Sequence, residues 1–452
     1  SLTGLLPKSN ALVTPLAAVK TTTNKVDKSA EPTTVKLKTP DTKSVKDIKF
    51  ANWGADNKDP VKMILDIGSV PSSIQALNKR VESVYGMGPM LYTETPDENG
   101  KEVVKPIIYS KQPGLKDFIK KIRLNHFCLE SITDLEGLGN VFPEFIVNNT
   151  YTQILSVRHK EAKHCRWSVK EKGQSKYCAI SSEWGTDQAI TDSNCTVVMV
   201  ADPWLTTDEL KKWLKDNKIK KFIYPVSYPS LGKTYYQTPS WKASMDAGWT
   251  KIAQLIPKTI LSTLENVKRL QWHVQIPYDY WEKEFPKSDY VDNLAQRKTD
   301  MQEKMQDVDD FLSGADKAGK SFYSHYGTDP TTRKEYPGWK FTPLDNNPKF
   351  DKDILATATA NAKILFSWGV DPAIIGQQSI GGQSNGAGSG SDKREADMIL
   401  KGSNAKSDMI AEPIEFAIEF NGWGNGDIKL GFKKELLTTL DKNPTGSEKS
   451  LV

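Results

Sequence analysis

Cysteine and histidine are scarce in this chain of 452 residues, which has four cysteines and five histidines. The cysteines are Cys128, Cys165, Cys178 and Cys195. No two of them have the C-x-x-C spacing of a metal or redox motif, and four thiols in so long a chain do not make a disulfide framework. His159 and His164 add the right ligand types for zinc beside Cys165 and Cys178, but the spacing fits no common pattern. We therefore expect ordinary strand residues, a reducing compartment, and no metal or cofactor.

Long apolar runs are also absent. No run approaches 18 apolar residues, so no membrane span is predicted. The first 20 residues lack the charged start and continuous apolar core of a signal peptide, so secretion is not expected. The net charge of +5 is mild, and it permits contact with nucleic acid without indicating a dedicated binder. Apolar residues at 38% and charged residues at 26% predict an ordinary globular protein, and the length predicts about three domains.

The first 48 residues are rich in Lys, Thr, Ser and Pro, and from Lys20 onward they contain almost no large apolar side chains. Such a segment cannot bury enough surface to fold alone. We expect it to be a flexible tail or an arm that becomes ordered on a neighbouring subunit. Folded structure is predicted to begin near Phe50.

The next part of the chain alternates helical and strand patterns. Residues 60–93 predict two helices, the second capped by Ser72 or Ser73, and then a strand. A further helix is predicted over 114–136. Strands are predicted at 140–148, 151–159, 164–171, 175–183 and 195–201.

Two long helices follow. Thr238 is a good N-cap and Pro239 a good first helical residue, and apolar side chains then recur at helical spacing. We expect this helix to span 239–268, with a kink at Pro257. The second long helix is predicted over 351–368.

Between them we expect a strand at 271–277, a charged helix at 290–312, and two more strands at 321–326 and 339–343. Near the C-terminus, residues 428–432 predict a strand, and a short polar tail follows.

The second long helix leads to a loop with almost no side-chain bulk. Residues 376–391 read GQQSIGGQSNGAGSGS, and a new helical pattern begins at Asp392. A loop of this length inside a compact domain is usually functional or disordered. The regular helices on both sides favour a functional loop.

Three stretches resemble tailed-bacteriophage portal proteins, and the matches cover most of residues 60–440. The first is ILFSWGVDPAIIG at 364–376, with the polar loop and the resumed helix after it; Asp371 stands where the family usually has proline. The second is Asp134 followed by Gly139-Asn140-x-Phe142-x-Glu144. The third is GKTYYQTP at 232–239, where Gln237 replaces the usual glycine.

The resemblance implies an α+β portal-type subunit with an α/β wing, two long stem helices, a small α/β clip inserted between them, a tunnel loop and a short crown. The implied boundaries are a flexible arm at 1–48, the wing at 49–238, the first stem helix at 239–270, the clip at 271–348, the second stem helix at 349–369, the tunnel loop at 370–392, and a long helix, a strand returning to the wing and a short tail at 393–452.

The resemblance also implies a function. Portal proteins form a closed ring, usually of twelve copies, at one vertex of a phage capsid. Double-stranded DNA is packaged and ejected through the ring, which contacts the terminase, a head–tail connector protein and the major capsid protein. We therefore expect a virion protein that is assembled in the bacterial cytoplasm, makes no membrane contact and is not an enzyme.

The residues that border the DNA channel under this interpretation are Gln377, Gln378, Ser379, Gln383, Ser384, Asn385, Lys393 and Arg394. Because DNA must slide both ways, the lining cannot be densely cationic: each neutralised phosphate adds affinity. Gly, Ser, Gln and Asn offer only weak hydrogen bonds. The positions of Lys393 and Arg394 are explained about equally well by a solvated helix terminus and by a role in the channel.

Two other functions remain open. Gly314 to Ser321 reads GADKAGKS and matches the phosphate-binding loop pattern, in which Lys320 would contact phosphates and Ser321 would hold magnesium. That motif needs a strand before it and a helix after it, whereas the pattern here predicts a helix before and a strand after. The other alternative is a structural ring or adaptor that conducts no DNA.

Overall fold

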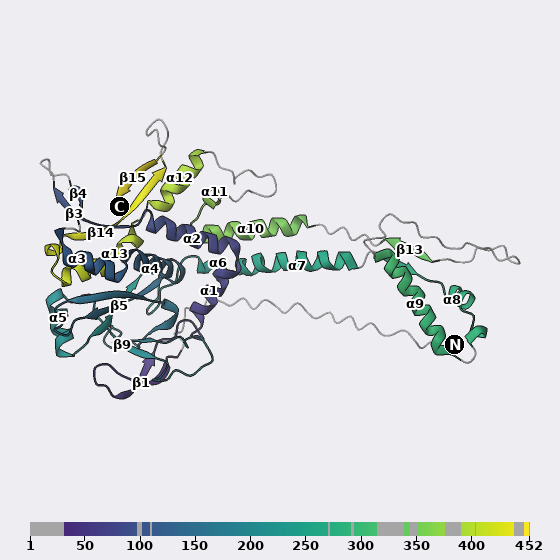
Figure 1. Ribbon diagram of the computed structural model, residues 1–452, viewed down its shortest axis with the longest axis horizontal. Helices are drawn as coiled ribbons and strands as arrows, with labels where there is room; N and C mark the ends of the chain where they lie inside the picture. Colours follow the sequence, from purple (N-terminus) through teal and green to yellow (C-terminus); the bar gives the residue numbers. More distant parts are fainter. Residues whose placement is uncertain are drawn as a thin grey trace. The chain divides into compact units, whose positions relative to one another are not determined.

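The computed structural model describes residues 31–96, 102–108, 111–269, 272–290, 293–313, 339–343, 350–375, 390–402, 404–437 and 447–451. The chain forms two compact units. The first contains residues 1–242, 368–375 and 388–452, and the second contains 243–367 and 376–387. Figure 1 labels the helices and strands of both units.

The first unit is built on a seven-stranded sheet. Its strands are β5 (Asn140–Val147), β6 (Ile154–Lys160), β7 (Cys165–Trp167), β8 (Tyr177–Ile180), β9 (Thr196–Val200), β10 (Lys221–Ile223) and β11 (Val226–Ser227). The strands pair antiparallel except for β9 and β10, which are parallel. The parallel pair needs a crossover, and α5 (Thr207–Asp216) provides it, starting with a capping box between Thr206 and Glu209.

Helices cover one face of this sheet, as Figure 1 shows for α4 (Leu124–Leu138) and α13 (Ala405–Phe420). Both helices contact β5 or its neighbours β6 and β11. The layer between these helices and the sheet is aromatic. The rings of Phe145 and Phe222 stack with centroids 5.0 Å apart, and Phe416 of α13 meets Phe145 edge-on at 6.1 Å. This buried layer holds the unit together, because aromatic side chains bury large apolar areas.

Two further helices, α1 (Asp59–Ser69) and α2 (Pro71–Tyr85), precede a smaller sheet. Its order is β15–β14–β3–β4, formed by β15 (Ser447–Leu451), β14 (Ile428–Leu437), β3 (Pro89–Pro96) and β4 (Glu102–Pro106). The predicted return strand at 428–432 thus pairs with β3, and part of the polar tail adds a strand beside it. The second helix starts with Pro71 after Val70, so neither Ser72 nor Ser73 is its cap.

The prediction of a flexible segment over all of residues 1–48 is wrong for its last part. β1 (Thr33–Lys38) and β2 (Val45–Phe50) form a hairpin, and Val35, Leu37, Ile48 and Phe50 are buried. The hairpin continues onto β7, where Ala51 N donates to Trp167 O at 2.9 Å. Its apolar partner surface is more than a hundred residues away in the sequence, and local composition could not reveal it. Residues 1–30 lie outside the described residues.

Two predicted helices are interrupted. The helix expected at 114–136 is two helices, α3 (Pro113–Ile122) and α4, because Arg123 between them is left-handed with φ 52°. The first long helix begins at Lys242 instead of Pro239, and it divides into α6 (Lys242–Asp246) and α7 (Trp249–Arg269) at Gly248, whose φ is 84°. Pro257 lies inside α7, where it removes one helical hydrogen bond.

The second unit contains α7, β12 (Trp272–Gln275), α8 (Tyr278–Glu284), α9 (Leu294–Ser313), β13 (Lys340–Pro343) and most of α10 (Asp351–Trp368). β12 and β13 pair antiparallel. The sequence pattern did not predict α8, whereas α10 coincides with the predicted second long helix. The predicted strand at 321–326 lies outside the described residues. None of the described helices is both long and apolar enough to cross a membrane.

Candidate functional site

Six of the eight predicted channel residues lie outside the described residues: Gln377, Gln378, Ser379, Gln383, Ser384 and Asn385. The other two, Lys393 and Arg394, lie on α12 (Gly390–Lys401), which begins two residues before the predicted restart of the helix at Asp392. The Lys393 side chain is exposed and that of Arg394 is partly exposed. Their channel role stays a prediction, but both are placed on the surface of a regular helix.

Two lysines fix α12 to the rest of the first unit. Lys434 on β14 is 1% exposed, and its ammonium donates to Lys401 O at 2.7 Å and Asn404 Oδ1 at 3.1 Å. In return, Lys401 donates to Glu435 O at 2.8 Å and pairs with Asp397 at 2.8 Å. Burial lowers the pKa of Lys434, because the charged ammonium loses part of its hydration at the C-terminal end of α12. The reciprocal bonds fix the direction in which α12 leaves the sheet.

The elbow between α12 and α13 depends on a close backbone approach. A Cβ added to Gly402 would lie 2.8 Å from Met398 O, closer than a real side chain tolerates. The next helix begins at Ala405. Glycine at this position allows the chain to turn while Lys434 bonds to groups on both sides of the turn. The sequence pattern predicted one long helix here and did not reveal the elbow.

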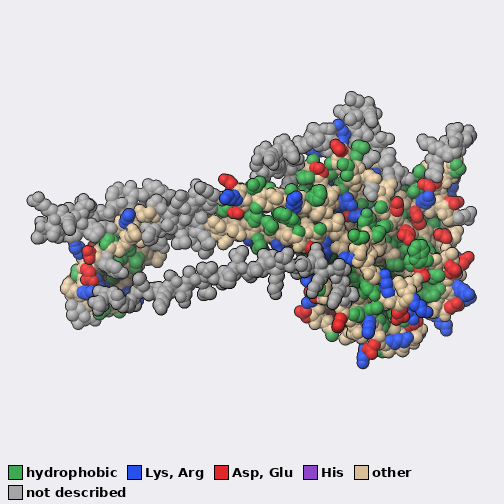
Figure 2. All heavy atoms as spheres, turned by 180° about the vertical axis from the view of Figure 1, so that it is seen from behind, with side chains coloured by type: hydrophobic (Ala, Val, Ile, Leu, Met, Phe, Trp, Pro, Cys, Tyr) green, Lys and Arg blue, Asp and Glu red, His purple; other side chains and the backbone are tan. Residues whose placement is uncertain are grey.

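The long helices of the second unit expose apolar side chains. On α7, Leu255 and Leu261 are each 59% exposed, and on α10 Leu355 is 61% and Phe366 84% exposed. Figure 2 shows hydrophobic side chains at the surface among the charged ones. Single exposed apolar residues are ordinary, whereas exposed apolar residues that gather on one surface are typical of interaction sites.

The residues that carry the family resemblance meet at one buried junction in the first unit. Asn140 Nδ2 donates to Gln237 O at 3.0 Å, and Gln237 N donates to Asn140 Oδ1 at 3.0 Å. Tyr236 accepts from Trp167 N at 2.9 Å and donates to Ala51 O at 3.0 Å. Two motifs almost a hundred residues apart in the sequence therefore join β5 to the segment that leads into α6.

The unusual Gln237 also has a structural role. Its Oε1 accepts from the backbone N of Ser230 at 2.7 Å and from the Ser230 hydroxyl at 2.8 Å. The same hydroxyl accepts from Thr238 N at 2.9 Å. The glutamine therefore closes the loop from 230 to 238. Thr238 donates through its backbone here, and the predicted helix start after it is not observed.

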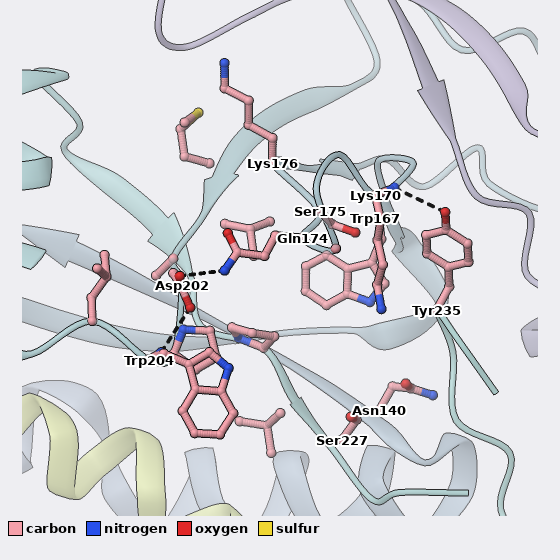
Figure 3. A pocket seen from close by; sticks show the side chains of 18 of the residues that line it. Asn140, Trp167, Lys170, Gln174, Ser175, Lys176, Asp202, Trp204, Ser227 and Tyr235 are labelled. Atoms are coloured by element: carbon pink, nitrogen blue, oxygen red, sulfur yellow. Dashed lines mark hydrogen bonds between the residues drawn. The ribbon is translucent and has the colours of Figure 1, made fainter. Parts of the chain in front are cut away.

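A pocket of about 400 Å³ lies beside this junction. Figure 3 shows its lining side chains, with Trp167, Trp204 and Tyr235 among them. Its charged groups have partners: Gln174 donates to Asp202 at 2.5 Å, Lys170 donates to Thr234 O at 2.8 Å, and Lys176 pairs with Asp41 at 3.1 Å. Sequence reasoning missed this pocket, because its lining residues come from several distant segments.

The structure brings together a Ser–His–Asp set that the sequence did not indicate. Ser131 Oγ lies 3.4 Å from His159 Nδ1, and His159 Nε2 lies 2.9 Å from Asp134 Oδ2. Ser131 is only 1% exposed, and Asp134 also accepts from Ala162 N at 2.7 Å. A buried hydroxyl gives a substrate no access to the nucleophile. These contacts therefore attach α4 to β6 and its following turn.

The zinc set considered from sequence does not assemble. Cys165 and Cys178 are fully buried in neighbouring strands, and His159 is held by Asp134. Within the described residues, no three side chains of the metal-ligating types form a group that could hold a metal ion. The motif from Gly314 to Ser321 lies outside the described residues, but the residues before it form helix α9, as expected, and not the strand that a phosphate-binding loop requires.

No protein-family model matches the sequence, and a search of curated proteins finds no match either. Solved structures do match. A chain in the neck of an empty GTA particle, computed with C6 symmetry, is 12% identical with a TM-score of 0.53, and the match covers 87% of this chain and 86% of that one. The chain shares its fold with a protein of a particle neck.

Two further structures agree with this likeness. A chain of the virion of a native gene transfer agent particle is 11% identical with a TM-score of 0.51, covering 87% of this chain and 86% of that one. A chain in the neck of the native GTA particle, computed with C12 symmetry, is 11% identical with a TM-score of 0.50, covering 82% and 83%. Identity this low shows the fold alone. The predicted α+β, portal-type fold is confirmed.

Proposed function

We propose that the chain is the subunit of a closed, portal-type ring in the neck of a phage-like particle. The observation that carries the proposal is the fold, which is shared over 87% of this chain with chains of gene transfer agent particles. Two of these structures are necks computed with C6 and C12 symmetry. A ring of twelve copies is compatible with both symmetries, because a twelvefold ring also contains sixfold symmetry.

The apolar side chains of α7 and α10 support a ring. Leu255 and Leu355 are more than half exposed in the single chain. Burying a leucine contributes about 1.5–3 kcal/mol, so side-by-side copies would gain stability from every such contact. In a heterologous, head-to-tail interface each subunit uses two different surfaces, and closure of the ring satisfies all of them.

We further propose that double-stranded DNA passes through the bore of this ring. The support comes from the chemistry of the segment between α11 (Pro372–Ile375) and α12, in which Gly, Ser, Gln and Asn predominate. A lining of this kind does not hold the DNA at any fixed position along the channel, and it adds little salt-dependent affinity for DNA. Lys393 and Arg394, with Asp392 and Glu395 beside them, would border the channel without making it adhesive.

The remaining partners follow from the same proposal. The ring would sit in the virion at one capsid vertex, contact the major capsid protein, and bind the terminase during packaging and a head–tail connector afterwards. It would be assembled in the host cytoplasm. Its contribution would be positional and not enzymatic, because hydrolysis of nucleotide would belong to the terminase.

Sizing of the purified chain tests the ring. We expect a single species with twelve times the 50.5 kDa of one chain, and electron micrographs of closed rings with an open bore. A solitary chain or an open filament under the same conditions would refute the proposal. A closed ring that retains no DNA inside particles would instead favour a structural adaptor.

Charge reversal tests the channel role. The double substitution Lys393→Glu and Arg394→Glu should leave ring assembly intact and lower the amount of DNA retained in particles. The same reversal at Lys212, which is exposed on α5, is the matched control and should change neither. Equal retention in both variants would exclude Lys393 and Arg394 from the channel.

The phosphate-binding loop pattern is tested separately. If Lys320 binds nucleotide, ATP with magnesium should raise the melting temperature of the wild-type chain, and Lys320→Ala should abolish the shift. We expect no shift in either protein, because the α9 helix stands where a buried strand is required.

A further inference from the structure

A second pocket of about 270 Å³ lies in the first unit, and its charges do not balance. Three charged side chains from three helices line it: Arg80 from α2, Glu136 from α4 and Lys406 from α13. The rest of the lining is largely aromatic and hydroxyl-bearing, with Tyr228, Trp241 and Ser230 among its residues.

One buried carboxylate serves both cations. The Glu136 side chain is 3% exposed. Its two oxygens accept from Arg80 Nη2 at 3.2 Å and Arg80 Nε at 3.3 Å, and Oε2 also accepts from Lys406 Nζ at 2.6 Å. Two positive charges and one negative charge leave a net positive charge beside a carboxylate that is almost fully buried. An uncompensated charge in such a place is costly.

The electrostatic environment of Lys406 shows the imbalance. Burial lowers the pKa of this lysine; Glu136 acts to raise it, and Arg80 lowers it further. The ammonium also lies 5.1 Å from the centroid of the Tyr228 ring, a favourable but weak contact. The existing partners therefore do not offset the desolvation of the second cation.

Donors remain for a ligand. Lys406 has three N–H donors and uses one for Glu136. Arg80 uses Nε and Nη2 for Glu136, and among the described residues its Nη1 donors have no acceptor, so they are available to a ligand. In the larger pocket of Figure 3, Lys170 and Lys176 each have an oxygen acceptor of their own, Thr234 O and Asp41 Oδ2 respectively. In the smaller pocket, Arg80 and Lys406 share the single carboxylate of Glu136.

We propose that the pocket formed by Arg80, Glu136 and Lys406 binds a phosphate group. A guanidinium and an ammonium together provide the fork and the point charge that phosphate recognition uses. Phosphate brings enough oxygens to accept from both cations at once. The pocket is also several times larger than the roughly 30 Å³ share of one water, which leaves room for part of the molecule that carries the phosphate.

The phosphate could belong to a small molecule or to the backbone of DNA, and titration calorimetry on the full chain distinguishes them. One arm uses inorganic phosphate and the other a short DNA duplex, both at constant ionic strength. Lys406→Met should weaken binding of inorganic phosphate at least about tenfold, which is the loss expected for one charge-assisted hydrogen bond. Lys406→Arg should retain binding, and Lys212→Met on the exposed face of α5 is the control that should bind as the wild type does.

Glu136→Gln removes the carboxylate that competes with the ligand and should tighten phosphate binding, which a purely structural ion cluster would not show. If Lys406→Met also weakens the duplex, the phosphate is that of DNA; if only inorganic phosphate is affected, it is that of a small molecule. Absence of phosphate binding by the wild type, or equal binding by Lys406→Met and Lys212→Met, would overturn the proposal. Neither result depends on whether the chain forms a ring.

Discussion

The sheet of the first unit and the long helices of the second place their apolar side chains in opposite environments. Phe142, Phe145 and Phe222 of the sheet are fully buried. Leu255 and Leu261 of α7 and Phe366 of α10 are mostly exposed in the same chain. The first unit buries its aromatic core, whereas α7 and α10 keep these apolar side chains exposed in the single chain. In the proposed ring, the buried residues of the first unit would stabilise each subunit, and the exposed residues of α7 and α10 would join one subunit to the next.

The strongest test of this comparison is one substitution made in both regions. Phe145→Ala should destabilise the fold by about 3–5 kcal/mol, because it leaves a cavity between Phe222 and Phe416. Phe366→Ala removes an 84%-exposed ring and should change stability by no more than about 0.5 kcal/mol. Denaturant titration of the two variants measures both effects. Similar losses of stability in the two variants would contradict the distinction between a buried core in the first unit and exposed apolar side chains on the long helices.

A second test addresses assembly. Leu255→Asp and Leu261→Asp should leave the melting of the subunit nearly unchanged and reduce the ring fraction, because each leucine contact that is lost removes roughly 1.5–3 kcal/mol from every interface. Light scattering over a dilution series gives the ring fraction. Lys258→Asp, on the same helix, controls for the added charge. Rings as stable as wild type in the leucine variants would show that α7 is not part of the interface.

A smaller effect should come from the polar junction. Asn140→Ala leaves the N–H and carbonyl of Gln237 without their partner and should cost about 1–3 kcal/mol. Asn149→Ala removes an exposed amide that accepts from Lys220 and should cost almost nothing. Denaturant titration gives the unfolding midpoint of each variant. Equal midpoints would show that the hydrogen bonds between Asn140 and Gln237 do not stabilise the fold.

The smallest effect concerns a half-buried carboxyl on α13. Burial raises the pKa of Glu415 above its usual 4.5, although Leu430 N donates to it at 2.7 Å. The folded state therefore binds the proton more tightly than the unfolded state, and the ionised carboxylate destabilises the fold above the raised pKa. Glu415→Gln, which keeps an acceptor, should be more stable than the wild type at neutral pH. The advantage should fade as the pH falls through the raised pKa towards 4.5.

Stability measured against pH checks this prediction. Glu419→Gln is the matched control, because Glu419 is exposed on the same helix and accepts from Thr207. A pH-independent gain for Glu415→Gln would mean that the effect is not electrostatic.

Local patterns of the sequence determined the elements with strong periodicity. The strands at 140–148 and 195–201 and the helix at 351–368 were predicted close to their observed bounds, because alternation and helical spacing are properties of neighbouring residues. The motifs around Asn140, Tyr236 and Trp368 indicated an α+β, portal-type fold, which the likeness to chains of gene transfer agent particles confirms. Their physical role, the bonds between Asn140 and Gln237, was not visible in either motif alone.

Only the tertiary structure decided which distant groups share an environment. The hairpin at 33–50 folds because β7 supplies its partner surface, and the break at Gly402 is held by Lys434 from a strand further along the chain. The smaller pocket likewise exists because three helices bring Arg80, Glu136 and Lys406 together. Charge balance in a buried space depends on separations of a few ångströms, and sequence distance does not report these separations.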